Sequence, residues 1–523
     1  MRDFQRPGRS IVIAENGMAA TSHPLASKVA IQMLEQGGTA ADAAVAAAVL
    51  LGVCEPHMTG IGGDAFALIK PAGEERLVGL NGSGVAPAAL DAAALRATGD
   101  VIDPASAAAV TVPGAVDALV RLATEWGRLG VATCLAPAIH YAEQGVPVAP
   151  RVALDWSASA DALRGAARQD FLLAGAAPRA GQVFRAPKQA EALRRIAMDG
   201  RAGFYEGEVA EDMVAALRAA GGVHTLDDFA EQATLDVAPI AGHYKGQELV
   251  ELPPNGQGAA AILMAAILER FDLSGLDPFG VERTHLEAEA AKLAYDARDR
   301  FVADPSTALT DRLLAPETAD ALAALIDPAR AMAAPAERAE AVHKETVYLT
   351  VVDRNRMAVS LIYSIFHSFG SGLGTDKFGI LLHNRGAGFT LTEGHPNEAA
   401  PGKRPMHTII PAMLRRDGRV EMSFGVMGGQ YQAAGHARFL TNLVDYGMDP
   451  QAAIDAPRAF PQNGVLSLET GYGDDVVAGI ASRGHSVERA PAPIGGAQAI
   501  RIDADGTLWG ASDPRKDGIA LGY

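Results

Sequence analysis

Thr346 stands where a charged stretch gives way to β-branched and aromatic residues, in HKETVYLTVVD (343–353). A threonine hydroxyl is hardly ionised at neutral pH, so it needs an adjacent base to act as a nucleophile. An α-amino group has an unperturbed pKa of about 7.7 to 8.0, so a chain beginning at Thr346 would carry nucleophile and base on one residue. This chemistry requires cleavage of the Glu345–Thr346 bond. The alternative is a threonine that only opens a β-strand.

Two segments on either side of a polar turn predict the element that must position this threonine. Residues 346–353 and 357–366 are both rich in β-branched and aromatic residues, the pattern of an antiparallel hairpin. If the loop between them has the three residues 354–356, Thr346 faces Ser364 on the neighbouring strand. A two-residue loop would shift the register by one and turn the facing side chain away.

A second predicted strand, VEMSFGVMG (420–428), ends in the pair Gly428-Gly429, where backbone N–H groups could point at a ligand. The other motifs are weaker. GIGGDA (60–65) formally matches a dinucleotide fingerprint, but a helix and a loop precede it instead of a strand. A turn that permits close backbone packing is the preferred interpretation. No G-x-S-x-G elbow, phosphate-binding loop or H-E-x-x-H motif occurs in the sequence.

The sequence predicts neither a metal site nor a cofactor. Several histidines lie in predicted loops and strands without metal-ligand spacing, and each is expected to be a hydrogen-bonded structural group. These histidines are His23, His57, His367, His383, His395 and His407. Only Cys54 and Cys134 are present, so neither a disulfide framework nor a cysteine-based zinc site can be built, and a reducing compartment is compatible.

Length and charge bound the class of protein. A chain of 523 residues can hold two or three ordinary domains or one large sandwich. Its 62 acidic and 45 basic residues give a net charge of −17, which argues against a nucleic-acid partner because phosphate contacts require clustered cations. The opening residues have no apolar stretch long enough for a secretory signal, so we expect a cytoplasmic protein. The most apolar run, 40–53, is shorter than the ~20 residues of a membrane span and contains Asp42, which predicts a buried helix and no membrane partner.

The rest of the chain mixes helical and strand-like segments, which predicts an α+β fold. Residues 25–53 and 112–145 have helical patterns, and the short strand-like segments 66–70 and 75–81 lie between them.

Two later segments precede Thr346 in the sequence. Residues 281–301 place apolar residues at helical spacing with charges on the other face, as in an amphipathic helix. Residues 327–345 are rich in alanine, proline and charge, which predicts a mobile connector that ends at Thr346.

Several motifs occur in one order along nearly the whole chain. They are SHPLAS (22–27), GGTAADAAVAAAVLLGVCEPHMTGIGGDAF (37–66), FYEGEVA (204–210), LPPNGQG (252–258), ETVYLTVVD (345–353), FGSGL, GKRP and the glycine pair after a strand. Together they resemble the γ-glutamyltranspeptidase family of N-terminal nucleophile (Ntn) hydrolases. The resemblance implies a four-layer αββα sandwich formed from a precursor that cuts itself into a large subunit, residues 1–345, and a small catalytic subunit, residues 346–523.

The resemblance also assigns roles to residues of this chain. Thr346 matches the nucleophile, with Glu345 before the cleavage site, and Ser364 matches the second hydroxyl that hydrogen-bonds the nucleophile. Gly428 and Gly429 match the glycine pair of the oxyanion hole, whose donors contribute about 3 to 4 kcal/mol each in other acyl-transfer enzymes. The implied reaction is acylation of Thr346 by an amide carbonyl, loss of the amine, and deacylation by water or an acceptor amine.

The chain departs from the family pattern in the pocket that recognises a γ-glutamyl group. The family's arginine, asparagine, acidic pair and serine pair fall on Ser83, Phe366, Ala387 with Gly388, and His407 with Thr408. Loss of these contacts predicts strong rejection of γ-glutamyl donors.

We therefore expect a small carboxylate-bearing amide as substrate. Arg385, Arg404 and His407 could bind its carboxylate, and Asn384 and Thr408 are also predicted to bind substrate. YSIFHSFGSG (363–372) with LLHNRGAGF (381–389) resembles the oxamate amidohydrolase branch, which releases ammonia.

Two other functions stay open, together with the state of assembly. The first is a γ-glutamyltransferase or glutathione hydrolase with a different clamp. The second is an uncleaved protein that only binds a ligand. Whether two processed heterodimers associate as a dimer is also open.

Overall fold

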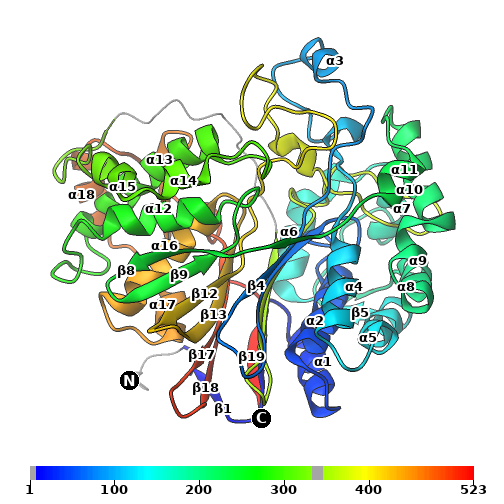
Figure 1. Ribbon diagram of the computed structural model, residues 1–523, viewed down its shortest axis with the longest axis horizontal. Coiled ribbons are helices and arrows are strands. Elements are labelled where there is room, and N and C mark those ends of the chain that lie inside the picture. Colours follow the sequence, from blue (N-terminus) through cyan, green and yellow to red (C-terminus); the bar gives the residue numbers. More distant parts are fainter. Residues whose placement is uncertain (1–7, 333–345) are drawn as a thin grey trace.

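Two stacked β-sheets form the centre of the protein (Figure 1). The computed structural model describes residues 8–332 and 346–523, and within them each sheet has seven strands paired antiparallel throughout. In spatial order the first sheet consists of β1 (Val12–Ala14), β18 (Leu508–Ser512), β17 (Gly496–Ile502), β13 (Arg419–Met427), β12 (Ala412–Arg416), β9 (Gln247–Glu251) and β8 (Ile240–Tyr244). The second consists of β19 (Ile519–Gly522), β2 (Met18–Thr21), β10 (Val347–Val352), β11 (Ala358–Ser364), β3 (Asp64–Lys70), β4 (Val78–Gly82) and β7 (Leu235–Val237).

Helices cover the outer face of each sheet, so the molecule has four layers (Figure 1). On the side of the second sheet lie α1 (Pro24–Glu35), α2 (Ala40–Cys54), α4 (Ala115–Glu125), α5 (Val131–Gln144), α6 (Pro150–Ser159), α7 (Gly165–Phe171), α8 (Pro187–Asp199), α9 (Ala202–Tyr205), α10 (Gly207–Ala219) and α11 (Leu226–Ala230). On the side of the first lie α12 (Gly258–Leu268), α13 (Val281–Phe301), α14 (Thr310–Leu314), α15 (Pro316–Ala323), α16 (Tyr431–Val444), α17 (Pro450–Asp455) and α18 (Asp474–Ser482). The predicted αββα sandwich is confirmed.

Smaller elements complete the molecule. The short helix α3 (Ala92–Arg96) projects at the top in Figure 1. The remaining strands are β14 (Ala459–Gln462), β15 (Val465–Leu468) and β16 (Ser486–Arg489), which form one small sheet, and β5 (Val146–Pro147) with β6 (Val183–Phe184). Three 3-10 turns are η1 (Ala107–Ala109), η2 (Ala160–Ala162) and η3 (Arg385–Gly388), of which η3 carries a predicted substrate-binding residue.

Strands from before and after Thr346 share both sheets. β10 and β11 lie between β2 and β3 in the second sheet, and the block β18, β17, β13 and β12 lies between β1 and β9 in the first. The segments 1–345 and 346–523 therefore share one core and cannot fold as separate domains. Glu345 and the part 333–345 of the predicted connector lie outside the described residues.

Helix α2 is the buried helix that the sequence predicts. All of its residues are buried, and Asp42 with Thr39 forms a capping box at its N-terminus, with the Thr39 N–H donating to the Asp42 carboxylate at 2.8 Å. Within the described residues no helix is both long and apolar enough to cross a membrane.

Helix α13 has the predicted bounds, but its charged face is buried instead of solvated. Arg283 and Glu287 pair at 2.9 Å, and Lys292 and Glu289 pair at 2.7 Å. Arg283 also donates to the side chain of Thr441 on α16 at 2.8 Å. Neighbouring elements therefore cover both faces of this helix, which its pattern alone does not reveal.

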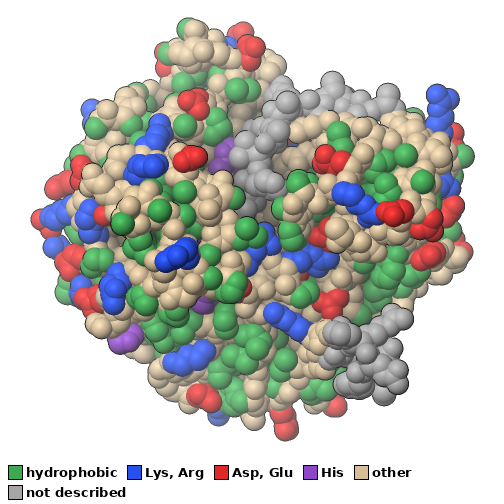
Figure 2. Space-filling model, turned by 180° about the vertical axis from the view of Figure 1, so that it is seen from behind, with side chains coloured by type: hydrophobic (Ala, Val, Ile, Leu, Met, Phe, Trp, Pro, Cys, Tyr) green, Lys and Arg blue, Asp and Glu red, His purple; other side chains and the backbone are tan. Residues whose placement is uncertain are grey.

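Acidic and basic side chains are interspersed over the described part of the face shown in Figure 2. Such a distribution offers no continuous basic surface there to a polyanion.

Candidate active site

β10 and β11 form the predicted hairpin in the predicted register. The N–H of Asp353 donates to the carbonyl of Met357 at 3.0 Å across the three-residue loop, and the strand pairs follow in step. At the far end, Thr346 donates a hydrogen bond from its Oγ1 to Ser364 Oγ over 3.2 Å. Both residues are buried, with 1 % of Thr346 exposed. The hairpin thus holds the two hydroxyls together at the end of two central strands.

Contacts between the sheets place the end of β13 beside this hydroxyl pair. Thr350 Oγ1 lies 2.7 Å from Ser423 Oγ, and a Cβ on Gly425 would meet the ring of Tyr348 at 2.3 Å. Thr350 thus faces Ser423, and Tyr348, two residues earlier on β10, faces Gly425, two residues later on β13. Continued by two more residues, this spacing sets Thr346 opposite the last residue of β13.

The glycine pair follows at that point. Gly428 and Gly429 have φ angles of 121° and 56°, which a side chain would strain. A Cβ on Gly428 would also lie 2.8 Å from the Cα of Gly495, and Gln257 Nε2 donates to the carbonyl of Gly429 at 3.1 Å. The backbone conformation and the neighbouring groups together hold this turn in one shape.

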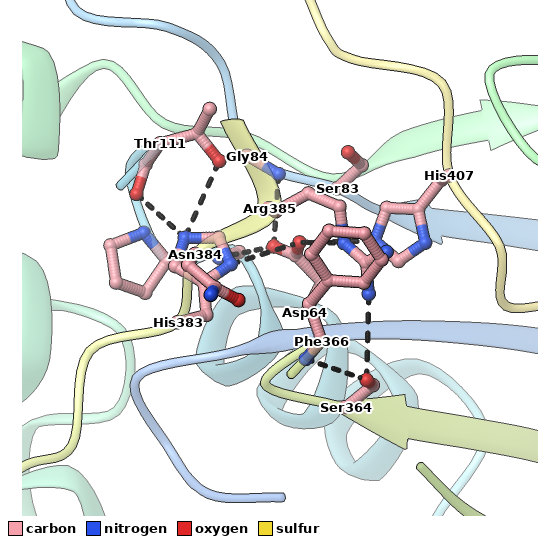
Figure 3. Close-up of polar contacts among 12 residues, drawn as sticks. Asp64, Ser83, Gly84, Thr111, Ser364, Phe366, His383, Asn384, Arg385 and His407 are labelled. Atoms are coloured by element: carbon pink, nitrogen blue, oxygen red, sulfur yellow. Dashed lines mark hydrogen bonds and ion pairs between the residues drawn. The ribbon is translucent and has the colours of Figure 1, made fainter. Parts of the chain in front are cut away.

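Ser364 lies beneath a buried arginine (Figure 3). Its Oγ accepts a hydrogen bond from the N–H of Phe366 at 2.9 Å and one from Arg385 Nη2 at 3.4 Å. Arg385 Nη1 donates to Thr408 Oγ1 at 3.2 Å, and the guanidinium carbon lies 4.0 Å from the centre of the Phe366 ring. Of the predicted substrate-binding residues, Arg385 therefore reaches the hydroxyl pair, and Thr408 is hydrogen-bonded to Arg385.

Asp64 is a central residue that the sequence analysis missed (Figure 3). It pairs with Ser364 in the register of β3 with β11, and it is fully buried. One carboxylate oxygen accepts from the N–H groups of Gly84 and Gly114 at 3.1 and 3.3 Å. The other lies 3.0 Å from His407 Nε2, 3.3 Å from His383 Nδ1 and 3.8 Å from Arg385 Nε. We call Asp64, His383, Arg385 and His407 the Asp64 cluster.

The surroundings of Asp64 stabilise its charged form. Burial by itself raises the pKa of Asp64, but the His383 and His407 rings outweigh it and hold the pKa well below its ordinary value. The loop before it, GIGGDA, is the close-packing turn that the sequence predicts. A Cβ on Gly62 would lie 2.1 Å from the Leu381 carbonyl oxygen, and one on Gly63 would lie 2.3 Å from that of Ser364. A signal for Asp64 was therefore present in the motif, as an acid at the end of a glycine turn.

The two histidines of the cluster are hydrogen-bonded structural groups, as the sequence predicts. His383 Nε2 donates to the carbonyl of Thr111 at 2.7 Å, since a carbonyl can only accept. His407 Nδ1 accepts from the N–H of Ile409 at 3.3 Å, so its proton is on Nε2, facing Asp64.

The expectation that His407 binds a carboxylate as a cation needs correction. Burial, together with the nearby Arg385, lowers the pKa of His407 to about 3, so the ring is neutral near pH 7. Both ring nitrogens are already engaged within the protein. His407 therefore supports Asp64 and carries no positive charge to a substrate.

Arg404 and Asn384 brace loops around the site. Arg404 donates to the carbonyls of Ser83 and Ala233 at 3.0 and 3.1 Å. Asn384 accepts from the N–H of His367 at 3.1 Å and donates to the carbonyl of Pro104 at 3.1 Å. These contacts tie each side chain to backbone groups, so neither has the position beside Ser364 that Arg385 has.

Two residues at positions where the family pattern has γ-glutamyl contacts belong to a buried apolar cluster. Phe366 and Ala387 are buried together with Leu90, Phe389 and Leu391. Side chains of this kind cannot hold an α-amino group or an α-carboxylate.

A buried group of possible metal ligands lies on α13, away from the residues above. His285, Glu289 and His485 bring ligand atoms within 4.8 Å of one another in the described part of the chain. Hydrogen bonds occupy these atoms. His285 Nδ1 lies 2.7 Å from His485 Nε2, and Lys292 Nζ donates to a carboxylate oxygen of Glu289 at 2.7 Å. We interpret the group as a hydrogen-bonded cluster, because the ammonium of Lys292 sits where a cation would bind.

Comparison with known proteins assigns the chain to a family. The sequence pattern of gamma-glutamyltranspeptidase matches residues 26–523. The chain is 35% identical to the glutathione hydrolase-like YwrD proenzyme of Bacillus subtilis, over 98% of this chain and 99% of that protein. It is 36% identical to the oxamate amidohydrolase proenzyme of Klebsiella pneumoniae, with the same coverage.

A solved structure agrees in fold. The cephalosporin acylase from Bacillus halodurans superposes with a TM-score of 0.93 at 37% identity, covering 100% of this chain and 99% of that one. The chain is therefore an amide-cleaving enzyme of the γ-glutamyltranspeptidase family of N-terminal nucleophile hydrolases.

Proposed function

We propose that the chain cuts itself between Glu345 and Thr346 and that Thr346 then serves as the nucleophile of an amidohydrolase. The hydrogen bond from Thr346 Oγ1 to Ser364 Oγ, at the start of the hairpin, is the observation that carries the proposal. Cleavage would convert the amide nitrogen of Thr346 into a free amine, the base that its hydroxyl needs. The large subunit 1–345 and the small subunit 346–523 would stay together because both contribute hydrogen-bonded strands to each sheet.

The reaction follows from these groups. Thr346 Oγ attacks the amide carbonyl while its proton passes to the α-amine. The backbone N–H groups of Gly428 and Gly429 stabilise the negative oxygen of the tetrahedral intermediate. The carbon–nitrogen bond then breaks, the leaving amine takes the proton, and an acyl-threonine ester remains. Water or an acceptor amine releases the acyl group and restores the hydroxyl.

The acyl group is a small one that carries a carboxylate, as in oxamate. Arg385 supports this assignment, because it is a buried cation whose two terminal nitrogens reach Thr408 and Ser364. Planar guanidinium groups bind carboxylates in a fixed geometry. The relative named as an oxamate amidohydrolase supports the same choice.

Hydrolysis of γ-glutamyl amides is the second candidate. The relative named as glutathione hydrolase-like, at 35% identity, favours it. The apolar cluster around Phe366 and Ala387 argues against it, since a γ-glutamyl group needs polar partners for its α-amino and α-carboxylate groups. A cytoplasmic location and a dimer of processed heterodimers stay predictions.

Activity assays with two different substrates distinguish the two candidate functions. Ammonia release from oxamate is measured beside release of the chromophore from a γ-glutamyl anilide. We expect oxamate to have the higher kcat/KM. Efficient cleavage of only the anilide would contradict the choice of acyl group while leaving the Thr346 mechanism intact.

Mass spectrometry of the purified protein tests the processing step. Wild type should yield a fragment of residues 346–523. Thr346→Ala should yield only the intact chain and no activity, whereas Thr346→Ser should still be cut. Thr350→Ala is the matched control, because Thr350 lies on the same strand and its hydroxyl bonds Ser423 instead of Ser364. A 346–523 fragment from Thr346→Ala would refute the proposed nucleophile.

A further inference from the structure

A large cavity adjoins the glycine turn, and its lining includes no residue of the Asp64 cluster. It has a volume of about 660 Å³. Its inner wall includes Met427 and Gly428, and also Met58, whose carbonyl accepts the N–H of Ile365 next to Ser364 at 3.3 Å. The cavity therefore reaches the end of β13, and Met58 connects its wall to the residue that follows β11.

The walls of this cavity are built close against the turn. The loop 490–495 forms one wall, and its Gly495 packs against the glycine turn. A Cβ on Gly428 would lie 2.8 Å from the Cα of Gly495, and a Cβ on Gly495 would lie 2.4 Å from the carbonyl oxygen of Met427. Another wall is one face of α6, where Arg151, Leu154 and Ala158 follow at helical spacing.

The lining is mainly apolar, and its central charges are paired. Tyr431, Phe460 and Ile494 supply apolar surface. Arg151 pairs with Asp155 at 2.8 Å, and Lys516 lies 3.7 Å from the same carboxylate. Such a site has room and surface for a flat or apolar group and little net charge to select an ion.

A second, smaller cavity of about 110 Å³ lies beyond Gln430, the residue after the glycine pair, which lines both cavities. Its lining includes Gly388 and Phe389, three and four residues after Arg385, which we assign to the acyl group. The two cavities differ in size in a way that matches the two sides of an amide bond. A released ammonia molecule needs no more room than a water molecule, about 30 Å³.

We propose that the cavity beside Gly428 binds the amine part of the substrate and that this part is an aromatic or apolar amine. The inference rests on the proposed acyl-threonine mechanism. In that step the carbon–nitrogen bond breaks, the ester to Thr346 Oγ forms, and the amine leaves into the cavity with one added proton.

Two substrates with the same acyl group test this assignment. Oxamate releases ammonia, and N-phenyl oxamate releases aniline. Ala158→Trp fills the cavity from an exposed position on α6, so the fold should tolerate it. Ser157→Trp is the matched control, because Ser157 is exposed on the same helix and is not part of the cavity lining.

The readout is the ratio of kcat/KM for N-phenyl oxamate to that for oxamate, in proteins shown by mass spectrometry to contain the 346–523 fragment. Ala158→Trp should lower this ratio at least tenfold, and Ser157→Trp should leave it within twofold of wild type. An equal ratio in all three proteins overturns the proposal, as does a wild type that cleaves oxamate but not N-phenyl oxamate.

A failure of the proposed function would look different, since neither substrate would then be cleaved. Calorimetric binding of N-phenyl oxamate to the same three proteins then decides. Binding at least tenfold weaker in Ala158→Trp than in Ser157→Trp and wild type supports the cavity. Equal binding, or none, overturns it.

Discussion

The nucleophile hairpin (346–364) and the Asp64 cluster meet at Ser364 but are built in different ways. The hairpin is one continuous segment, and its loop length alone sets which residue faces Thr346. The cluster brings together side chains from β3, from the segment before η3 and from the segment before β12, which are far apart in the chain. Local pairing thus determines where the hydroxyls are, and packing of distant segments determines the charge beside them. Changes in the two regions should therefore have different signatures.

The largest expected effect is on the stability that the cluster provides. Asp64→Asn should lower the free energy of unfolding by about 3 to 5 kcal/mol, because it removes the negative charge from the buried ion pair of Asp64 with Arg385. Chemical denaturation of the processed enzyme measures this. Asp42→Asn, a buried acid that caps α2, should also destabilise the protein but leave the preference among substrates unchanged.

The pH dependence of that loss sharpens the comparison. The pKa of Asp64 is lower in the folded protein than in the unfolded chain. Its stabilising contribution is therefore fully present above the unfolded pKa, about 4, and is lost only as pH falls through the folded pKa. The stability gap between wild type and Asp64→Asn should stay constant from about pH 5 to 8. A gap that shrinks within this range would show that the carboxyl titrates there.

Gly428→Ala should act on the chemistry. The substitution strains a φ of 121° and places a Cβ 2.8 Å from Gly495, so the turn must move. Loss of one oxyanion donor costs about 3 to 4 kcal/mol, roughly 10²- to 10³-fold in kcat. Gly447 also has a positive φ, 59°, but an added Cβ there would meet no neighbouring atom within 4 Å, so Gly447→Ala serves as the control for backbone strain. A similar fall in kcat for both variants would contradict the assignment of the oxyanion hole to the turn at Gly428.

Arg385→Met should act on substrate choice. Charge-assisted hydrogen bonds contribute about 1.5 to 3 kcal/mol, so kcat/KM for oxamate should fall roughly 10- to 100-fold. The neutral analogue oxamide should lose much less, because it has no carboxylate. Arg404→Met is the matched control, since its guanidinium donates to backbone carbonyls, and it should keep the oxamate-to-oxamide ratio. If both variants lower the oxamate-to-oxamide ratio of kcat/KM, Arg385 is not the one residue that binds the carboxylate.

The last prediction concerns the slope of stability with pH at His407. Its folded pKa of about 3 lies below the unfolded value of about 6.5, so the unfolded state binds the extra proton between these values. Stability should therefore rise with pH through this window, by at most about 1.4 kcal/mol per pH unit, and level off above about pH 6.5. His407→Gln should flatten that part of the profile in urea titrations from pH 4 to 7. An unchanged slope would show that other groups cause it.

The predictability of the site follows the same division. Thr346, Ser364 and the glycine pair could be found because hairpin register and strand ends are readable from alternation and turn length. Arg385 and Thr408 were expected to bind substrate, and the structure places Arg385 at Ser364 and Thr408 at Arg385. His407 and Arg404 were predicted to bind the carboxylate of the substrate, but burial keeps the first neutral near pH 7 and backbone carbonyls accept hydrogen bonds from the second. Asp64 was missed because its partners come from segments that no local pattern connects.

The charged face of α13 teaches a similar lesson. Its spacing indicates a helix with a solvated side, yet Arg283 and Glu287 are buried as a pair. Helical periodicity reports which residues share a face and cannot report what covers that face.

By itself the sequence determined the family, the strand pairing around Thr346 and the absence of the γ-glutamyl clamp residues, because motifs, turn length and residue identity are local properties. Only the tertiary structure decided which charges reach Ser364, which histidine is neutral and how large a cavity adjoins Gly428. Those properties depend on burial and on the distances between segments far apart in the chain, which exist only once the two sheets have packed together.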